Sequence, residues 1–170
     1  LNDLFPSLPV VDEENKIPPY SVRQQWKRYF IVDPLDGTRE FIKKNGEFCI
    51  NLALMENNIP VHGWIYHPCS GKGWYCRAGS RLKEFNHSLI LTDVDPVTTS
   101  PDKIIAVASR SFFNGKEEQL IETIRRDFNV DLRFLGSSLK QIHVAKGEAN
   151  LYLKASPSSE WDTAPGQLMV

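Results

Sequence analysis

A short acidic turn follows an apolar run near the start of the chain, in the stretch FIVDPLDGTREF. Asp33 and Asp36 are three residues apart, and Pro34 and Gly37 permit a tight reversal of the chain. The turn can therefore direct both carboxylates and the carbonyl of Leu35 toward one point. Oxygen ligands without a nearby His or Cys suit a hard cation such as Mg²⁺. These residues predict a cation site, and a surface turn without function is the alternative that they leave open.

A phosphate site is predicted beside this turn. Thr38 and the amides after Gly37 lie where a helix could begin, at residues 39–42. Free N–H groups at a helix N-terminus bind phosphate. A cation and a phosphate would then share one small cleft.

Two other acidic positions are far from the turn in sequence. Glu13 and Glu14 follow an apolar pair, and by themselves they are more typical of a solvated loop. Asp162 follows a tryptophan in SSEWDTAPG and by itself is more typical of a helix N-cap. Pro165 is expected in the first turn of that helix, where proline is tolerated.

The composition is ordinary for a globular protein. Hydrophobic residues make up 41% and charged residues 24% of the 170 residues, with a net charge of −1. This charge gives no broad electrostatic basis for binding nucleic acid or an anionic membrane. No apolar run of about 18 residues predicts a membrane span. The three cysteines match no zinc or disulfide spacing, so we expect reduced cysteines in the interior.

The first part of the chain is expected to be β-rich, as an antiparallel meander. Strands are predicted at residues 9–11, 27–32, 47–55, 60–66, 73–77 and 81–85. Pro34 is expected to stop the second of these strands at Asp33. The segment at residues 95–101 predicts a linker, which divides the chain into a β-rich half at 1–98 and an α/β half at 99–170.

The second part alternates strands and helices, which indicates an α/β unit. Strands are predicted at 104–108, 131–135 and 149–153, and helices at 116–128 and 138–146. The strand at 104–108 does not alternate and should be buried on both faces. The helix at 116–128 should bury an apolar stripe formed by Leu120, Ile121, Ile124 and Phe128.

Three separated motifs together resemble the inositol monophosphatase superfamily. They are DPLDGT after an apolar strand, the upstream Glu-Glu pair, and the downstream Trp-Asp-x-Ala-x-Gly. Within the superfamily the chain is similar to the bacterial 3′(2′),5′-bisphosphate nucleotidases, through residues 22–48, 108–111 and 135–140. The likeness extends over essentially the whole chain. It implies an α+β or α/β class with the layered αβαβα sandwich of the family.

The resemblance also implies roles for individual residues. Two or three Mg²⁺ ions would be held by Glu13, Asp33, the Leu35 carbonyl, Asp36 and Asp162. The catalytic set would be Glu13, Asp33, Asp36, Thr38 and Asp162. The substrate would meet Glu13, Leu35, Asp36, Gly37, Thr38, Ser109, Ser138, Lys140 and Asp162. Asp33 would bridge two ions, and Thr38 would help to orient the attacking water. The Ser-Ser-x-Lys segment is equally typical of a capped helix start.

The implied activity is Mg²⁺-dependent, lithium-sensitive hydrolysis of adenosine 3′,5′-bisphosphate to AMP and phosphate. The resemblance also implies action on the sulfated nucleotide, a role in sulfur assimilation or nucleotide recycling, and a cytoplasmic location. Peripheral association with the inner membrane and the oligomeric state stay open. The alternatives are an inositol or sugar monophosphatase of the same superfamily and a catalytically inactive metal-binding fragment.

The chain also departs from the family pattern. The helical region that precedes the Glu-Glu motif in the family, with its Thr-x-x-Asp, and the elements after Trp-Asp are absent from the 170 residues. We therefore expect an internal piece that lacks both ends of the fold. Asp12 stands where relatives usually have a small residue, and Pro165 replaces a common alanine. The four histidines are isolated from the motifs, so structural roles are expected for them.

Overall fold

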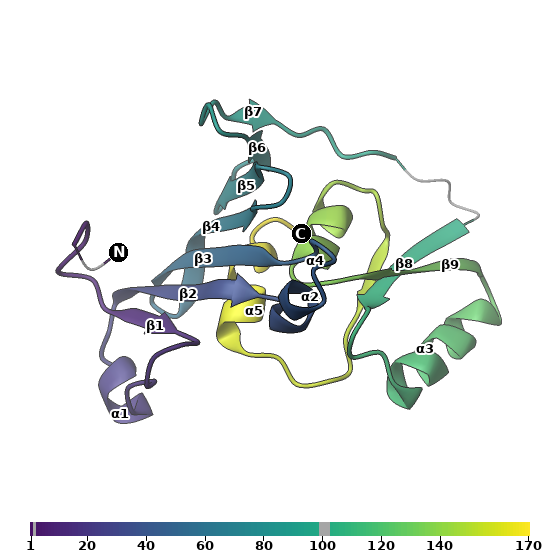
Figure 1. The fold of residues 1–170 in the computed structure, drawn as a ribbon, viewed down its shortest axis with the longest axis horizontal. Helices are drawn as coiled ribbons and strands as arrows, with labels where there is room; N and C mark the ends of the chain where they lie inside the picture. The colour runs from purple at the N-terminus through teal and green to yellow at the C-terminus, as the bar shows by residue number, and fades with distance from the viewer. Residues whose placement is uncertain (2, 99–102) are drawn as a thin grey trace.

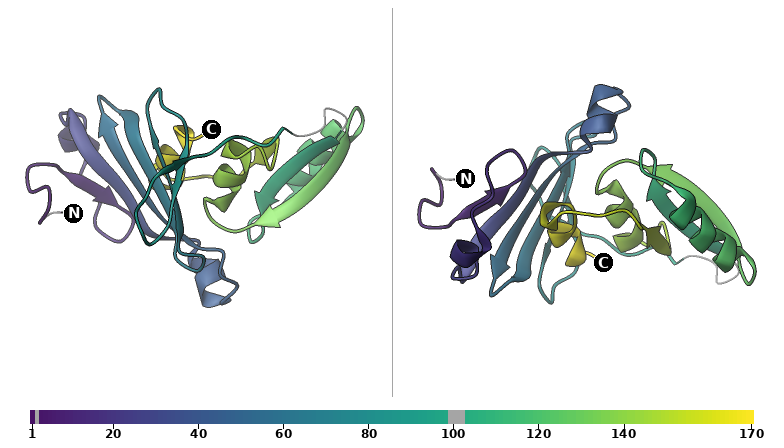
Figure 2. Two further views of the ribbon diagram at one scale, coloured as in Figure 1. Left: turned by 90° about the horizontal axis from the view of Figure 1, so that it is seen from above. Right: turned by 90° about the horizontal axis from the view of Figure 1, so that it is seen from below.

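The computed structural model describes residues 1, 3–98 and 103–170 and arranges their helices and strands in layers (Figure 1). In chain order the described elements are β1 (Val10–Asp12), α1 (Tyr20–Arg23), β2 (Arg28–Asp36), α2 (Thr38–Ile42), β3 (Cys49–Glu56), β4 (Ile59–His67), β5 (Lys72–Arg77), β6 (Lys83–Phe85), β7 (Thr92–Asp93), β8 (Lys103–Ser109), α3 (Gly115–Arg125), β9 (Asn129–Leu135), α4 (Leu139–Ala145), β10 (Leu151–Leu153) and α5 (Glu160–Gln167). A larger sheet, a layer with α4 and α5, a smaller sheet and α3 follow one another across the molecule (Figure 2).

The larger sheet confirms the predicted antiparallel meander from β2 onward, whereas the predicted antiparallel pairing of the first strand is wrong. Among the described residues it has seven strands in sequential order, from β1 to β7. β1 runs parallel to β2 at one edge, and each later pair is antiparallel. The tight turn between β3 and β4 places Asn57 and Asn58 at positive φ, which asparagine tolerates well.

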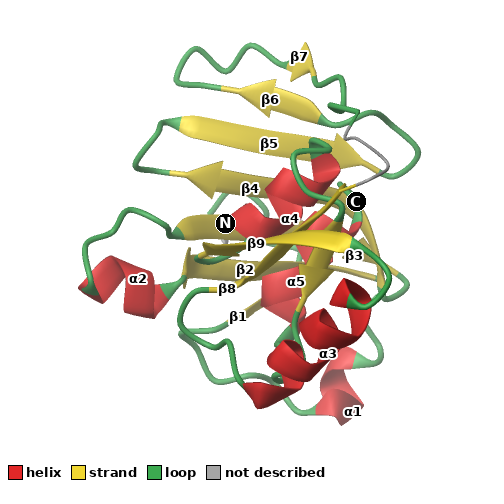
Figure 3. Ribbon diagram, turned by 90° about the vertical axis from the view of Figure 1, so that its right-hand side faces the viewer, coloured by secondary structure: helices red, strands yellow, loops and turns green. Residues whose placement is uncertain are grey.

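The predicted end of β2 at Asp33 is wrong, because the strand continues to Asp36. Asp33 pairs with Asn51 and Asp36 pairs with Cys49, so the register shifts between the two aspartates. Pro34 has no N–H to donate, and the irregularity carries the strand past it. α2 then begins at Thr38 and projects beyond the end of the sheet (Figure 3).

The smaller sheet confirms the predicted strand–helix alternation. Its described strands have the parallel order β10-β8-β9, and α3 packs on its outer side. β8 buries Ala106, Val107 and Ala108 completely, although its first residue is exposed. The predicted stripe on α3 is only partly correct. Ile121 is buried and Leu120 is exposed, while α3 ends at Arg125 and leaves Phe128, also exposed, beyond the helix.

The layer between the sheets joins the two halves of the chain. α5 packs on β2, β3 and β4, although it belongs to the second half by sequence. A Cβ atom on Gly63 of β4 would lie 2.5 Å from the carbonyl oxygen of Pro165, so glycine permits this close approach. The expected place of Pro165 is wrong, because it is the sixth residue of the helix and lies beyond the first turn. The proposed boundary at 98/99 and the end of the linker include residues outside the described ranges.

The cysteines only partly meet the expectation of a buried position. All three are free, and Cys49 and Cys76 are buried, but Cys69 is exposed. Of the helices in the described ranges, none combines the length and the apolar character that a bilayer crossing requires.

Candidate active site

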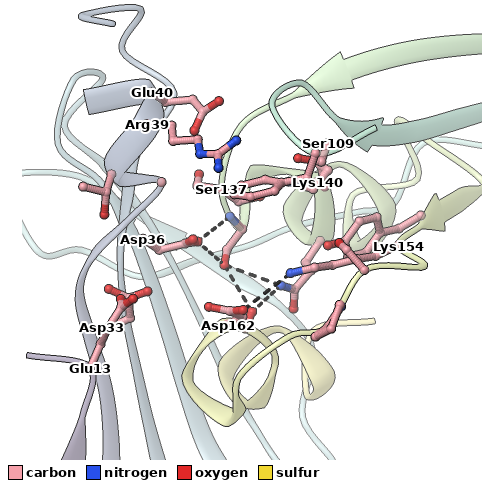
Figure 4. A pocket seen from close by; sticks show the side chains of 18 residues that line it. Glu13, Asp33, Asp36, Arg39, Glu40, Ser109, Ser137, Lys140, Lys154 and Asp162 are labelled. Carbon is pink, nitrogen blue, oxygen red and sulfur yellow. Dashed lines mark hydrogen bonds and ion pairs between the residues drawn. The ribbon is translucent and has the colours of Figure 1, made fainter. Parts of the chain in front are cut away.

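A pocket of about 450 Å³ opens where the end of β2, the start of α4 and the start of α5 meet. Figure 4 shows side chains from both halves of the chain pointing into it. Most of the predicted site residues line this pocket: Glu13, Asp33, Asp36, Gly37, Thr38, Ser109, Ser138, Lys140 and Asp162. The predicted Leu35 is not among the lining residues, and its carbonyl accepts a hydrogen bond from the Thr38 hydroxyl at 3.4 Å.

Three carboxylates form the acidic wall of the pocket. One oxygen each from Asp33, Asp36 and Asp162 lies within 4.8 Å of the other two. Glu13 lies beside Asp33 at the exposed rim (Figure 4). The fold therefore brings together two neighbours in sequence and an aspartate from the other end of the chain. No histidine or cysteine lines the pocket among the described residues, so its acidic wall offers oxygen ligands.

Asp33 is a buried carboxylate with a strongly raised pKa. Its side chain is 1% exposed, and burial raises its pKa to about 8, with a further rise from the charges of Asp36 and Glu13. A hydrogen bond from the amide of Leu35 at 2.9 Å opposes this rise. Burial also raises the pKa of Glu13, and repulsion from Asp162 adds to it. Asp33 and Glu13 thus face neighbouring acids, and a bound cation would supply counter-charge to both.

Asp36 is fixed by residues from the second half of the chain. Its Oδ2 accepts hydrogen bonds from the amide of Ser138 at 2.6 Å, the hydroxyl of Ser138 at 2.6 Å and Nδ2 of Asn51 at 3.1 Å. Burial raises the pKa of Asp36, and these bonds oppose the rise. Ser137, which precedes Ser138 in the chain, has φ of 45°, a left-handed conformation that non-glycine residues rarely adopt. The Ser138 hydroxyl serves Asp36 and makes no capping bond to α4, so the cap alternative is wrong for this residue.

Asp162 lies in the first turn of α5 but is not the N-cap residue, so that expectation is wrong. Ser159 is the N-cap, and its amide donates to Oδ2 of Asp162 at 3.0 Å. Lys154 Nζ lies 3.5 Å from the same oxygen. The carboxylate is therefore held by the helix start and contacts the Lys154 ammonium group (Figure 4).

The turn between β2 and α2 needs a glycine. Gly37 has φ of 92°, and a Cβ atom there would lie 3.1 Å from both the Glu47 carbonyl oxygen and the Ser137 Cβ. The turn therefore packs directly against the loop that precedes α4. Thr38 follows it with an exposed side chain at the pocket wall.

Basic and aromatic side chains form the wall opposite the acids. Lys140 is 4% exposed, donates from Nζ to the carbonyls of Ser137 (2.5 Å) and Leu135 (3.4 Å), and lies 5.5 Å from the centre of the Tyr152 ring. Burial lowers the pKa of Lys140. Lys154 is more accessible and pairs with Asp162 alone among the described acidic residues. The pocket thus has an acidic end and a basic end.

Several pocket residues were missed from the sequence. Lys154 and Tyr152 lie on or just after β10, and Arg39 stacks on the Phe112 ring at 4.1 Å. Asn51 lies behind the acids on β3. The YLK segment could have indicated Lys154, because a lysine that ends a short strand near the Trp-Asp motif is well placed to reach it. No local pattern marks Asn51, which lies within an apolar strand.

Polar contacts centred on Glu47 and Glu40 also join the two halves of the chain. Arg110 forms a two-bond pair with Glu47, 2.8 Å at each bond, and Glu47 also accepts from the Gly136 amide at 2.7 Å. Burial alone would raise the pKa of Glu47, but these bonds outweigh it and hold the pKa below its ordinary range. Buried Glu40 accepts a hydrogen bond from the Ser111 hydroxyl at 2.5 Å. The loop after β8 is thereby fixed to α2.

Comparison with known proteins agrees with this arrangement. The model of the inositol monophosphatase family matches residues 1–170. The chain is 40% identical over 169 residues to 3′(2′),5′-bisphosphate nucleotidase CysQ of Salmonella typhimurium, covering 98% of the chain and 64% of that relative. The protein of the same name from Escherichia coli K12 is 37% identical, with the same coverage.

Solved structures show the same fold. The crystal structure of CysQ from Bacteroides thetaiotaomicron, a bacterial member of the inositol monophosphatase family, superposes with a TM-score of 0.85 at 38% identity and covers 96% of this chain and 65% of that one. The chain spans slightly less than two thirds of the length of these relatives. The layered fold and the match along its whole length lead to one conclusion: the chain belongs to the inositol monophosphatase family.

Proposed function

We propose that this protein is a Mg²⁺-dependent, lithium-sensitive phosphatase that converts adenosine 3′,5′-bisphosphate to AMP and phosphate. The proposal includes action on the sulfated nucleotide, a cytoplasmic location, and a role in sulfur assimilation or nucleotide recycling. One observation carries it: a single pocket places the carboxylates of Asp33, Asp36 and Asp162 opposite two lysine side chains. Relatives at 37–40% identity that are named 3′(2′),5′-bisphosphate nucleotidase support the choice of substrate.

The acidic end fits Mg²⁺. It consists of carboxylate oxygens, and burial, followed by the charges of Asp36 and Glu13, raises the pKa of Asp33, so a bound cation would stabilise its ionised form. Asp33, Asp36 and Asp162 would hold the metal, with Glu13 and the Leu35 carbonyl completing the set that the family resemblance implies. Bound Mg²⁺ would neutralise the phosphate oxygens and lower the pKa of a water molecule.

The turn after β2 would receive the phosphate that is removed. Gly37 permits the turn at φ of 92°, and Thr38 presents its hydroxyl at the pocket wall, held by the Leu35 carbonyl. The Thr38 oxygen can accept a hydrogen bond from water while it donates to that carbonyl. Thr38 would thus orient the attacking water.

The basic end would bind the second phosphate. Lys154 has a single acidic partner among the described residues, at 3.5 Å, and metal binding to Asp162 would leave its ammonium free for an anion. Lys140 adds positive charge behind it, and Ser109 lies at the same wall. A substrate with two phosphates matches this arrangement better than inositol 1-phosphate, which has one.

Phosphate release tests the proposal directly. The chain is incubated with adenosine 3′,5′-bisphosphate or inositol 1-phosphate, with and without Mg²⁺, and then with added lithium. We expect Mg²⁺-dependent, lithium-sensitive release that favours the nucleotide by at least about 10-fold, or about 1.4 kcal/mol. Equal rates on both substrates would contradict the nucleotidase assignment. Mg²⁺ binding without turnover would favour the inactive metal-binding alternative.

A further inference from the structure

A buried asparagine lies directly behind the acidic wall. Asn51 on β3 has 0% exposure, and its Nδ2 lies 2.8 Å from the Ser138 hydroxyl, 3.1 Å from Oδ2 of Asp36 and 3.4 Å from the carbonyl of Trp161. One amide group therefore contacts the strand, the loop and the helix that supply the pocket. The Trp161 carbonyl can only accept a hydrogen bond, and the same is true of the Asp36 carboxylate when it is ionised. This chemistry fixes the NH₂ group on their side.

The other end of the Asn51 side chain has no partner. Its Oδ1 is buried and accepts no hydrogen bond from the described residues. An unsatisfied buried acceptor costs about 1–3 kcal/mol, so an apolar side chain of similar size would serve packing better. The arrangement indicates that the NH₂ group has a role that offsets this cost.

The three hydrogen bonds to Asp36 divide the roles of its two oxygens. Two bonds from Ser138 and one from Asn51 converge on Oδ2. A carboxylate oxygen has about two lone pairs for acceptance, so Oδ2 is saturated by the protein. Oδ1 receives no hydrogen bond from the described residues and is the oxygen left for a cation.

Asn51 also supports the helix that carries Asp162. Pro165 has no N–H, so the Trp161 carbonyl lacks the donor that normally comes from four residues later in a helix. Asn51 Nδ2 supplies a replacement at 3.4 Å. The side chain thereby couples the position of Asp36 on β2 to that of the α5 turn that contains Asp162.

We propose that Asn51 is a positioning residue for the cation: with Ser138 it holds Oδ2 of Asp36 and the start of α5, so that Oδ1 and the Asp162 carboxylate face one metal. The inference deepens the proposed function and rests on its metal requirement. Asn51 acts through Asp36 and touches neither metal nor substrate. Partners of this kind typically change metal affinity by about 10–100-fold when they are removed.

The test compares Asn51→Leu with the unaltered chain. The dissociation constant of Mg²⁺ is measured by titration calorimetry, and the melting temperature is measured without metal. We expect at least about 10-fold weaker Mg²⁺ binding. Asn51→Thr keeps one hydroxyl donor on a β-branched side chain, so we expect a smaller loss of affinity. This second variant also decides the matter if the leucine variant does not fold.

Met55→Ala is the matched control. Met55 lies on the same strand and the same face of the sheet, is 6% exposed, and does not line the pocket. Its truncation should lower the melting temperature and leave the Mg²⁺ dissociation constant unchanged. If Met55→Ala and Asn51→Leu weakened Mg²⁺ binding equally, the positioning role would be overturned, because general destabilisation of the fold would then explain the loss of affinity.

The remaining outcomes separate this inference from the proposed function. Unchanged Mg²⁺ affinity in the folded Asn51 variants overturns the inference and leaves the phosphatase proposal intact. Failure of the unaltered chain to bind Mg²⁺ overturns the metal requirement and the inference with it. Normal Mg²⁺ binding without phosphatase activity would contradict the proposal that the chain is a phosphatase. The comparison of the Asn51 variants would still test the positioning role.

Discussion

The hydroxyl of Ser138 lies 2.6 Å from Oδ2 of Asp36, although the two residues are 102 positions apart in the chain. This contact joins the end of β2 to the start of α4 at the floor of the pocket. Asp36 is thereby oriented by the second half of the chain while it belongs to the first. The acidic wall and the basic wall are consequently parts of one assembly and depend on how the halves pack.

Asp36→Asn should abolish Mg²⁺ binding and turnover. The amide cannot supply the negative charge, and with its oxygen accepting from Ser138 its NH₂ group would face the cation. Loss of an outer partner already costs about 10–100-fold, so we expect at least about a 100-fold drop in phosphate release. Glu14→Gln, which removes an exposed carboxylate nearby, is the control for lost charge. Turnover that survives in Asp36→Asn would refute the assignment of Asp36 as a metal ligand.

The metal-free chain should lose stability as pH rises toward 8. Asp33 keeps its proton up to about pH 8 in the folded chain, whereas an ordinary aspartate releases it near about pH 4. The folded state therefore binds more protons between these values, and the free energy of unfolding decreases with rising pH across that window. Melting curves in a chelating buffer test this. Saturating Mg²⁺ should largely restore the melting temperature near pH 8.

Asp33→Asn provides the complementary measurement. It removes the buried acid and its repulsion with Asp36 and Glu13, so the metal-free melting temperature should rise near pH 8 and depend less on pH. Mg²⁺ should no longer raise the melting temperature. A variant that is both less stable without metal and still stabilised by Mg²⁺ would contradict the role given to Asp33.

Gly37→Ala should impair both folding and phosphate binding. A side chain at φ of 92° is strained by roughly 1–2 kcal/mol, and the new Cβ would also approach Glu47 and Ser137 at 3.1 Å. Gly79→Ala is the matched control, since Gly79 has φ of 74° and nothing lies within 4 Å of its added Cβ. Denaturant unfolding and turnover are measured for both variants. Equal destabilisation in the two would show that the close packing of the turn has no effect.

Lys154→Gln should weaken binding of the bisphosphate selectively. A hydrogen bond to a charged group contributes about 1.5–3 kcal/mol, so KM for adenosine 3′,5′-bisphosphate should rise by about 10-fold or more. KM for a nucleotide with only the 3′-phosphate should change much less. Lys116→Gln, on exposed α3, serves as the charge control. An equal rise in KM for both substrates would contradict a role of Lys154 in binding the second phosphate.

Much of the fold followed from local patterns. Alternating β-branched and aromatic residues indicated the strands of the meander, and the strand–helix order from residue 103 onward indicated the parallel sheet. These predictions held because hydrophobic periodicity and turn chemistry act over a few residues. The predictions for Asp33 as a strand end and Asp162 as an N-cap were wrong, because a register shift and a preceding Ser159 decided them.

The sequence by itself determined the acidic motifs and, through their order, the family and the candidate metal ligands. Only the tertiary structure decided which oxygen of Asp36 is free, that Lys154 faces Asp162, and that Asn51 lies behind the acids. The contacts of Asp36 and Asn51 with Ser138, and of Asn51 with Trp161, join strands of the larger sheet to α4 and α5 across more than 80 residues of chain. Because packing between sheets and helices brings such distant groups into contact, no local pattern in the sequence could show them.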